Sequence, residues 1–258
     1  MSMALNDKVI VITGGAGLIG RAFCKAVCEA GATVVVAEIM EEAGKKLADE
    51  LAAQYGGRAV YGPVDITSDK SVNALLDLIH KKYGRIDGLV NNAYPRNKNY
   101  GAHFEDVTYT DFVENVGMHV GGYFLISQQF LKYFKKQKRG NIVNMGSIYG
   151  VMGPRFQIYE GTNMTMAVEY AVIKAGIINL TRYIARYYQK LNIRCNAISP
   201  GGVFNNQDPA FVAKYNSFGT NKGMIDAVDL CGTLVYLLSD ASACVNGQNI
   251  MVDDGWSL

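Results

Sequence analysis

The sequence predicts an α/β protein with a doubly wound fold, in which about seven parallel strands form one sheet with helices on both faces. Short runs of apolar and β-branched residues recur along the chain, and segments with a helical spacing of apolar residues separate them. A glycine-rich turn joins the first run to the first helical segment. Strands that alternate with helices form parallel sheets covered on both faces. No repeat or linker interrupts the alternation, so we expect a single domain over residues 1–258.

The apolar and β-branched runs give the strands in order along the chain. They cover residues 9–13, 33–37, 58–61, 88–91, 141–145, 194–197 and 249–252. The helical spacing predicts helices over 18–30, 41–55, 69–83, 109–137, 167–191 and 225–239. Three segments fit neither pattern, and each follows a strand: 94–107, 150–165 and 201–224. Because the carboxyl ends of parallel strands form the ligand crevice, we expect these segments to line a substrate cleft.

The composition bears on partners and location. Lys and Arg number 25 against 23 Asp and Glu, so no strong field marks the protein as a binder of nucleic acid or of an anionic membrane. We find no leader peptide and no apolar run of membrane-spanning length, and we expect a cytoplasmic protein. The cysteines form no Cys-x-x-Cys pair, which favours reduced thiols over a metal site: Cys24, Cys28, Cys195, Cys231 and Cys244.

The glycine-rich turn has the context of a dinucleotide-binding turn of the Rossmann type. Residues 13–20 read Thr-Gly-Gly-Ala-Gly-Leu-Ile-Gly and lie between the first strand and the first helix. Glycines let the backbone approach a pyrophosphate, and a helix N-terminus offers free amides and partial positive charge. An acid, Glu38, ends the next strand, which makes an ordinary turn the weaker interpretation. The residues expected at the phosphates are Gly14, Ala16, Gly17, Leu18, Ile19 and Gly20.

Glu38 also predicts which dinucleotide binds. A carboxylate at this place can accept hydrogen bonds from the ribose hydroxyls of adenosine but repels a 2′-phosphate, so we expect NAD rather than NADP. The alternative is that Glu38 is a solvated carboxylate at the start of a helix. Asp65 and Ile66 follow the third strand and are expected near the adenine, although Asp65 can instead cap the next helix.

Two Tyr-x-x-x-Lys patterns are candidates for a catalytic pair. Tyr94 and Lys98 flank Pro95 in a segment that is not helical, so their side chains need not meet. Tyr170 and Lys174 lie near the start of a predicted helix, where residues four apart share a face. The second pair can therefore touch one substrate.

The chemistry of a phenol explains why a lysine is needed beside it. With its ordinary pKa of about 10, a phenol is a poor base at neutral pH. We expect the ammonium of Lys174 to lower the pKa of Tyr170 by about two to three units, so that Tyr170 exchanges a proton while the cofactor exchanges a hydride. Ser147 follows the fifth predicted strand and is placed to bond the same substrate oxygen.

In these features the chain resembles the short-chain dehydrogenase/reductase family over nearly its whole length. The matching segments keep the family's order: 13–20, 91–93, 140–150, the Tyr170/Lys174 pair, 196–201 and 247–256. The resemblance implies that Ser147, Tyr170 and Lys174 are the catalytic serine, tyrosine and lysine, with Lys174 also binding the nicotinamide ribose. It further implies cofactor contacts from Asn91, Ala93, Pro200, Gly201 and Val203.

The chain departs from the family pattern at four single positions and one insertion. Leu18 stands where the short enzymes carry their middle glycine, and Tyr94 replaces the glycine of Asn-Asn-Ala-Gly. His119 occupies the place of an asparagine that supports a proton relay; it can contact the substrate, replace that asparagine, or merely satisfy a buried hydrogen bond. Asp254 interrupts a Gly-Gly pair near the C-terminus. The insertion, 150–165, is expected to cover part of the substrate cleft.

Basic and aromatic side chains on the cleft segments predict the substrate. Arg96 and Lys98 lie on one segment, and Arg155 and Tyr159 on the insertion. They indicate a polar, anionic, sugar-like substrate such as a sugar phosphate or nucleotide sugar, unless they are solvated loop side chains. Segments 91–101 and 147–160, with His119, are similar to the flagellin-modification branch of the family. That resemblance implies a role in making nonulosonic acids for the flagellin glycan.

Two other functions are open at this point. One is a sugar-nucleotide epimerase or dehydratase that recycles its NAD, although 258 residues leave no room for the further substrate domain of such enzymes. The other is a non-catalytic, NAD-binding regulator. The predicted helices 109–137 and 167–191 carry more apolar surface than one sheet face needs, which predicts a homodimer or homotetramer through Phe124, Phe130, Tyr183, Tyr187 and Tyr188.

Overall fold

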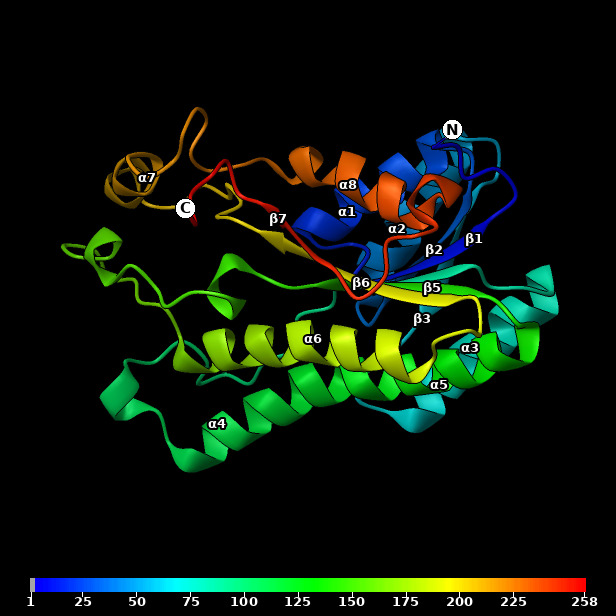
Figure 1. Ribbon diagram of the computed structural model, residues 1–258, viewed down its shortest axis with the longest axis horizontal. Helices are drawn as coiled ribbons and strands as arrows, with labels where there is room; N and C mark the ends of the chain where they lie inside the picture. The colour runs from blue at the N-terminus through cyan, green and yellow to red at the C-terminus, as the bar shows by residue number, and fades with distance from the viewer. Residues whose placement is uncertain (1–2) are drawn as a thin grey trace.

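The computed structural model describes residues 3–258, and seven parallel strands form its single sheet (Figure 1). The strand order is β3-β2-β1-β4-β5-β6-β7, and β1 pairs on its two sides with β2 and β4. The strand order reverses between β1 and β4, and such a switch point opens a crevice at the carboxyl ends of the strands. The predicted fold class is confirmed by β1 (Val9–Thr13), β2 (Thr33–Glu38), β3 (Ala59–Pro63), β4 (Gly88–Asn91), β5 (Gly140–Met145), β6 (Ile193–Pro200) and β7 (Asn249–Val252).

Helices cover both faces of the sheet (Figure 1). One face carries α1 (Leu18–Glu29), α2 (Glu41–Gln54) and α8 (Cys231–Leu238). The other face carries α3 (Asp69–Tyr83), α4 (Tyr109–Val116), α5 (Gly122–Gln137) and α6 (Val168–Tyr187). Each face has its own apolar core, and all five residues of β1 are buried because it lies between the two cores. A strand buried on both faces reads as a continuous apolar run, which is why β1 could be predicted.

The predicted helix 109–137 is correct in extent but is not one regular helix. A π-helical turn, Gly117–Gly121, lies between α4 and α5. Such turns are rare, and they occur frequently at functional sites. This one places His119 at its centre, fully buried.

One helix lies where the sequence predicted irregular structure. The segment 201–224 contains α7 (Pro209–Asn216). Asp208 caps it by accepting a hydrogen bond from the amide of Ala210, and Pro209 occupies the first turn. Both are start signals of a helix, and the short length of α7 is why no apolar spacing marked it.

A third, smaller apolar cluster joins the insertion, α7 and the C-terminal tail, and Figure 1 shows α7 and the C-terminus close together. The insertion contributes Ile158 and Tyr159, the segment 201–224 contributes Phe211 and Tyr215, and the tail contributes Trp256. Trp256 has no exposed surface, and its ring stacks on Tyr215 with 4.7 Å between centroids. The insertion, α7 and the tail therefore form one packed unit.

Within residues 3–258 no helix combines the length and the apolar character needed to cross a bilayer. In the same residues no group of three or more His, Cys, Asp or Glu side chains is arranged to hold a metal ion. The cysteines are free thiols, four of them buried and Cys244 exposed.

Candidate active site

The turn between β1 and α1 is shaped for close approach of a ligand to the backbone. Gly14 has φ +61°, and a Cβ there would lie 2.9 Å from the Cα of Ala93. A Cβ on Gly20 would collide with the carbonyl of Gly14. Asn92 fixes the turn to the end of β4, since its Nδ2 donates to the carbonyls of Thr13 at 3.0 Å and Gly14 at 3.1 Å. A backbone cradle that side chains would fill fits the pyrophosphate of a dinucleotide.

Glu38 lies across this turn at the end of β2. Its Oε2 accepts a hydrogen bond from the amide of Ala16 at 3.2 Å, and its Oε1 accepts from the amides of Ile39 and Met40. The side chain is buried, which differs from the solvated helix-start carboxylate that was the alternative. Glu38 thus joins the phosphate turn to the start of α2.

Asp65 and Ile66, the predicted adenine contacts, stabilise the turn before α3. The Oδ1 of Asp65 accepts from the amide and hydroxyl of Thr67, at 2.9 and 2.7 Å. Ser68, rather than Asp65, caps α3. The side chain of Ile66 is buried in the core near Gly122. Asp65 therefore closes the turn before α3, and Ile66 anchors it.

Asn91 lies in a buried polar network at the end of β4. Its Nδ2 donates to Ser127 at 2.9 Å and to Asn144 at 2.8 Å, and Asn144 donates to Thr181. Within the described part of the chain, the Oδ1 of Asn91 has no partner. The network ties β4 and β5 to α5 and α6, and so fixes the floor of the crevice.

Ser147, Tyr170 and Lys174 meet at the carboxyl ends of these strands. Ser147 follows β5, is 3% exposed and lies near enough to Tyr170 for its hydroxyl to lower the pKa of that phenol. Tyr170 and Lys174 lie one turn apart on α6, with the Lys174 Nζ 5.5 Å from the Tyr170 ring centroid. Lys174 donates to the carbonyl of Met145 at 2.9 Å. The structure brings the three predicted residues together.

The electrostatics of this group correct one sequence-based expectation. Burial raises the pKa of Tyr170 above its ordinary value, and the hydrogen bond from Ser147 counters only part of that rise. Burial also lowers the pKa of Lys174 to about 7. The expected lowering of the Tyr170 pKa by the Lys174 ammonium is therefore wrong for this structure, because desolvation acts against the charge of both groups.

His119 faces this group from the π-helical turn. Its ring centroid lies 4.9 Å from that of Tyr94 and 5.1 Å from that of Tyr123. Neither ring nitrogen has a hydrogen-bond partner in residues 3–258, so the interpretation of a satisfied core histidine does not hold. Burial, with the charge of Lys174 second, lowers the pKa of His119 well below its usual value. His119 is a neutral imidazole with unused donor and acceptor capacity.

Tyr94 lies beside this group, although the sequence marked it only as a rejected catalytic tyrosine and as a departure from the family pattern. Its ring centroid lies 5.9 Å from that of Tyr170 and 5.7 Å from the Nζ of Lys174. Its hydroxyl is 2.6 Å from that of Tyr100. The guanidinium of Arg96 lies against both rings, at 5.1 Å from Tyr94 and 6.0 Å from Tyr100. The signal for a role in the site was the replacement of the family glycine by tyrosine three residues after β4 ends.

The other predicted substrate contacts lie on the cleft segments and in the third apolar cluster, against which Tyr170 also packs. Lys98 is exposed on the segment after β4. The guanidinium of Arg155 lies 4.5 Å from the rings of both Phe218 and Trp256. Tyr159 is buried, with its hydroxyl 3.4 Å from that of Tyr149. Arg155 and Tyr159 therefore help to build the third apolar cluster.

The segment after β6 is held close to the crevice by backbone contacts. The amide of Gly201 donates to Val252 in β7 at 2.9 Å, and the amide of Gly202 donates to the hydroxyl of Tyr215. Val203 pairs with Ile225. Pro200, the last residue of β6, is buried. These contacts set the path of the chain where cofactor contacts are expected.

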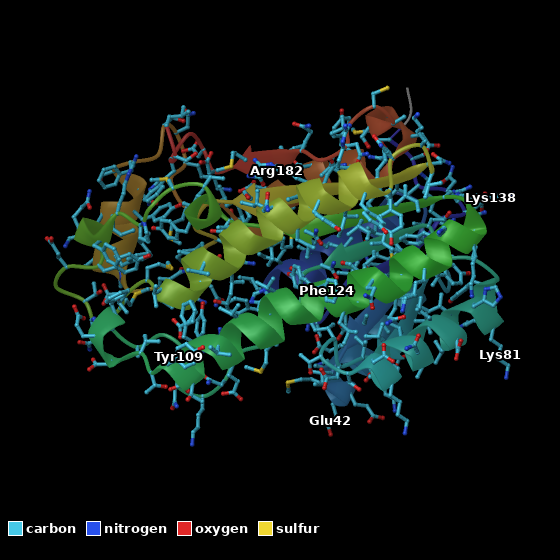
Figure 2. All side chains as sticks on the ribbon, turned by 60° about the horizontal axis from the view of Figure 1, so that its bottom comes forward. Glu42, Lys81, Tyr109, Phe124, Lys138 and Arg182 are labelled. Atoms are coloured by element: carbon cyan, nitrogen blue, oxygen red, sulfur yellow. The ribbon has the colours of Figure 1, made fainter. Side chains whose placement is uncertain are left out.

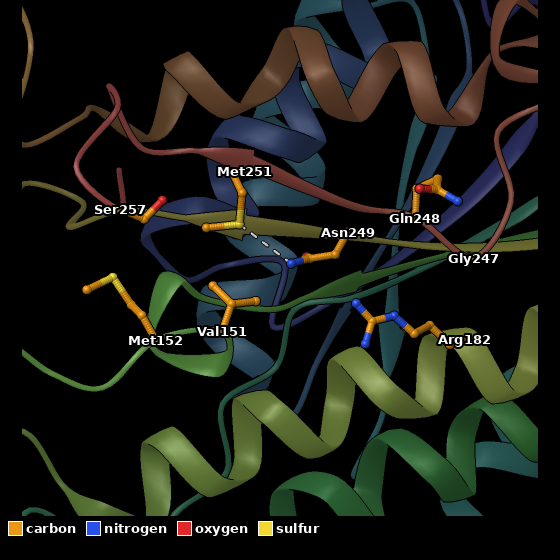
Figure 3. A pocket seen from close by; sticks show the side chains of 8 residues that line it. All are labelled: Val151, Met152, Arg182, Gly247, Gln248, Asn249, Met251 and Ser257. Carbon is orange, nitrogen blue, oxygen red and sulfur yellow. Dashed lines mark hydrogen bonds between the residues drawn. The ribbon is translucent and has the colours of Figure 1, made fainter.

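A cavity of about 450 Å³ lies between the turn that follows Ser147, α6 and β7 (Figure 3). It is lined by Val151 and Met152, by Arg182 of α6, and by Asn249 and Met251 of β7. Figure 3 shows Arg182 reaching from α6 toward β7. Its lining does not include the Ser147, Tyr170 and Lys174 group.

Comparison with known proteins agrees with this geometry. The family model described as enoyl-(acyl carrier protein) reductase matches residues 15–257. Post-translational flagellin modification protein A of Campylobacter coli is 43% identical over 256 residues, which cover 98% of this chain and 100% of that protein. The 7alpha-hydroxysteroid dehydrogenase of Bacteroides fragilis is 32% identical, covering 98% of this chain and 95% of that protein.

A solved structure shows the same architecture. The short chain dehydrogenase from Leptospira borgpetersenii, crystallised with bound NAD+, aligns with a TM-score of 0.85 and 32% identity, covering 99% of this chain and 94% of that one. The match spans the sheet, both helical layers and the site. The chain belongs to the short-chain dehydrogenase/reductase family of oxidoreductases.

Proposed function

We propose that the chain is an NAD-dependent oxidoreductase that transfers a hydride to or from the hydroxyl or carbonyl carbon of a polar, anionic sugar. The substrate class is a sugar phosphate or nucleotide sugar. The observation that carries the proposal is the meeting of Ser147, Tyr170 and Lys174 beside the glycine turn. This arrangement puts proton-transfer groups next to a dinucleotide cradle.

The chain's own residues handle the proton and the substrate oxygen. A bound nicotinamide supplies the hydride acceptor or donor. Ser147 holds the substrate oxygen through the hydroxyl that now meets Tyr170, and Tyr170 takes up or releases its proton. Lys174, with a pKa of about 7, passes between its charged and neutral forms near neutral pH. His119, neutral and without a partner among the described residues, has donor and acceptor capacity free to take the place of the family's relay asparagine.

The preference for NAD rests on Glu38. Its carboxylate is buried at the edge of the glycine turn and bonds the amide of Ala16. A 2′-phosphate brought to this place would meet a negative charge, whereas ribose hydroxyls would meet an acceptor. The exposed neighbours Ile39 and Met40 offer no positive charge.

The proposal that the substrate is an anionic sugar depends on Arg96. Its guanidinium lies against the Tyr94 and Tyr100 rings, and Tyr94 in turn contacts Tyr170. A ring-supported guanidinium is a pre-formed partner for phosphate or carboxylate. Flagellin modification is in the name of the Campylobacter coli relative, which supports a place in flagellin glycan and nonulosonic acid biosynthesis.

The test is reduction of NAD and NADP with sugar phosphates, nucleotide sugars, neutral sugars, steroids and simple alcohols. We expect turnover with an anionic sugar and NAD. Arg96→Gln should raise KM for that sugar by about tenfold or more and leave KM for NAD unchanged. Turnover of apolar alcohols alone would reject the sugar, and product without net NADH would favour the epimerase or dehydratase.

The proposal includes a homodimer or homotetramer in the cytoplasm. Figure 2 shows Phe124 on the outer side of the α4, α5 and α6 layer. Phe124, Tyr183 and Tyr187 are exposed there, with Tyr183 and Tyr187 stacked. The expectation for Phe130 was wrong, because it is fully buried in the core between α5 and the sheet. Free thiols are in keeping with a reducing compartment.

The oligomer is tested by light scattering at micromolar concentration. A monomer would contradict it, and Phe124→Glu is expected to weaken the assembly because it buries a charge in the contact. Gln54→Glu on α2, also at an exposed position and with the same change of charge, is the matched control.

A further inference from the structure

Asp254 occupies an unusual backbone position in the C-terminal tail. Its φ is +55°, in the left-handed region that favours glycine. One carboxylate oxygen, Oδ2, accepts hydrogen bonds from three consecutive amides, those of Asn221 at 2.8 Å, Lys222 at 2.7 Å and Gly223 at 2.8 Å. Successive amides that converge on one point form an anion-binding nest. Here the anion is supplied by the chain itself.

The loop 219–224 is moulded closely around this carboxylate. A Cβ on Gly219 would lie 2.9 Å from the Oδ2 of Asp254 and 2.5 Å from the Cα of Gly223. Thr220 adds two further bonds, from its amide at 3.0 Å and its hydroxyl at 2.9 Å to the Asp254 carbonyl. The amide bonds hold the pKa of Asp254 well below its ordinary value. The carboxylate is therefore charged at neutral pH.

The tail and the loop are connected to the crevice through aromatic side chains. Two residues after Asp254, the indole of Trp256 stacks on Tyr215 and donates to its carbonyl at 3.0 Å. The hydroxyl of Tyr215 accepts from the amide of Gly202, next to the expected cofactor contacts. Arg155 closes the unit from the insertion, against Trp256 and the carbonyl of Leu258.

We propose that Asp254 is a positioning residue that locks the loop 219–224 onto the C-terminal tail and so sets the substrate wall and Gly202 beside Tyr170. The wall consists of Tyr215 and Met224, which belong to the same apolar cluster that Tyr170 packs against. That Tyr215 and Met224 face a bound substrate rests on the proposed function. The lock itself is a property of the folded chain and can be measured without substrate.

The test compares Asp254→Gly and Asp254→Asn with the wild type. Glycine accepts φ +55° without strain, so the first variant removes only the carboxylate. Asparagine tolerates the same backbone region and keeps one acceptor oxygen but loses the charge. Asp49→Asn, at an exposed position on α2, is the control.

Amide hydrogen exchange measures directly whether the Asp254 carboxylate protects the amides of the loop 219–224. We expect the amides of Asn221, Lys222 and Gly223 to exchange about tenfold faster or more in Asp254→Gly, with a smaller change in Asp254→Asn and none in the control. Exchange in β1 and β4 should stay as in the wild type, because the core does not depend on this loop. Unchanged exchange of the three amides in Asp254→Gly would overturn the proposal.

Kinetics then separate positioning from mere stability. With the substrate found in the screen, Asp254→Gly should raise KM by about three- to tenfold, lower kcat less, and keep the thermal midpoint within about 2 °C of the wild type. A loosened loop with unchanged kinetics would also overturn the positioning role. If the wild type reduces neither cofactor with any compound, the proposed function fails while the exchange result still decides whether the lock exists.

Discussion

Lys174→Met is expected to stabilise the free protein while abolishing its activity. Lys174 is 5% exposed, and burial lowers its pKa from 10.5 to about 7. Its ammonium donates to the Met145 carbonyl, with the rings of Tyr94 and Tyr170 near it. The chain therefore retains a group whose charged form is disfavoured in the folded state, which is typical of functional sites.

The size and sign of the effect follow from proton linkage. The depressed pKa means that between about pH 7 and 10.5 the unfolded chain binds a proton that the folded chain does not, so this group makes stability rise with pH across that window. Well below pH 7, Lys174 is charged in both the folded and the unfolded chain, and the full free-energy cost of burying that charge applies. With 1.36 kcal/mol per pKa unit, the cost is about 4 kcal/mol at pH 7 and about 2 kcal/mol at pH 9.

Methionine removes that cost but also removes one hydrogen bond. Loss of the bond to Met145 costs about 1 kcal/mol. The net gain is therefore about 3 kcal/mol at pH 7 and about 1 kcal/mol at pH 9. For a chain of this size the gain at pH 7 corresponds to a midpoint higher by roughly 5 to 10 °C.

The assay is thermal unfolding of the cofactor-free protein at pH 6, 7, 8 and 9. Lys46→Met on α2, an exposed lysine, serves as the control and should change the midpoint little at any pH. Two results would refute the reasoning: a Lys174→Met variant less stable than the wild type at pH 7, or a gain that does not shrink as the pH rises. Either would mean that Lys174 is not held against a desolvation penalty.

Three further changes test other parts of the site. Tyr170→Phe should lower turnover by about a thousandfold or more and leave dinucleotide binding, followed by fluorescence, unchanged; residual activity above a tenth would remove Tyr170 from proton transfer. Glu38→Ser should raise the NADP-to-NAD ratio of kcat/KM by about tenfold, and an unchanged ratio would place selectivity elsewhere. Trp256→Ala, which empties a fully buried site, should cost about 3 to 5 kcal/mol in denaturant unfolding, whereas a loss below about 1 kcal/mol would contradict the packing of the tail.

The parts of the fold that could be predicted are those encoded locally. The run Val9–Thr13 is apolar throughout because β1 is buried on both faces, and the glycines after it are required by close backbone contacts. Tyr170 and Lys174 could be paired because one helix fixes their relative position. In each case the interaction that determines the structure involves residues that are close together in the sequence.

The parts that could not be predicted depend on contacts between distant segments. The charge of Arg155 indicated a substrate contact, yet its guanidinium lies on the rings of Phe218 and Trp256, which the sequence places more than 60 residues away. The apolar spacing over 109–137 predicted one continuous helix, and nothing in that spacing indicated the π-helical turn around His119. Asp254 marked a departure from the family pattern, but its partners in the loop 219–224 appear only in the folded chain.

The error about Tyr170 has the same origin and bears on the mechanism. Spacing places a phenol and an amine on one helix face, but the balance between attraction and desolvation is set by everything that surrounds them. Around Lys174 lie the rings of Tyr94 and Tyr170 and the neutral imidazole of His119, and none of these supplies a negative charge at neutral pH. Burial therefore dominates, and the free site holds a neutral phenol beside an amine that titrates near pH 7. We therefore expect activation of Tyr170 to depend on a ligand that changes this environment.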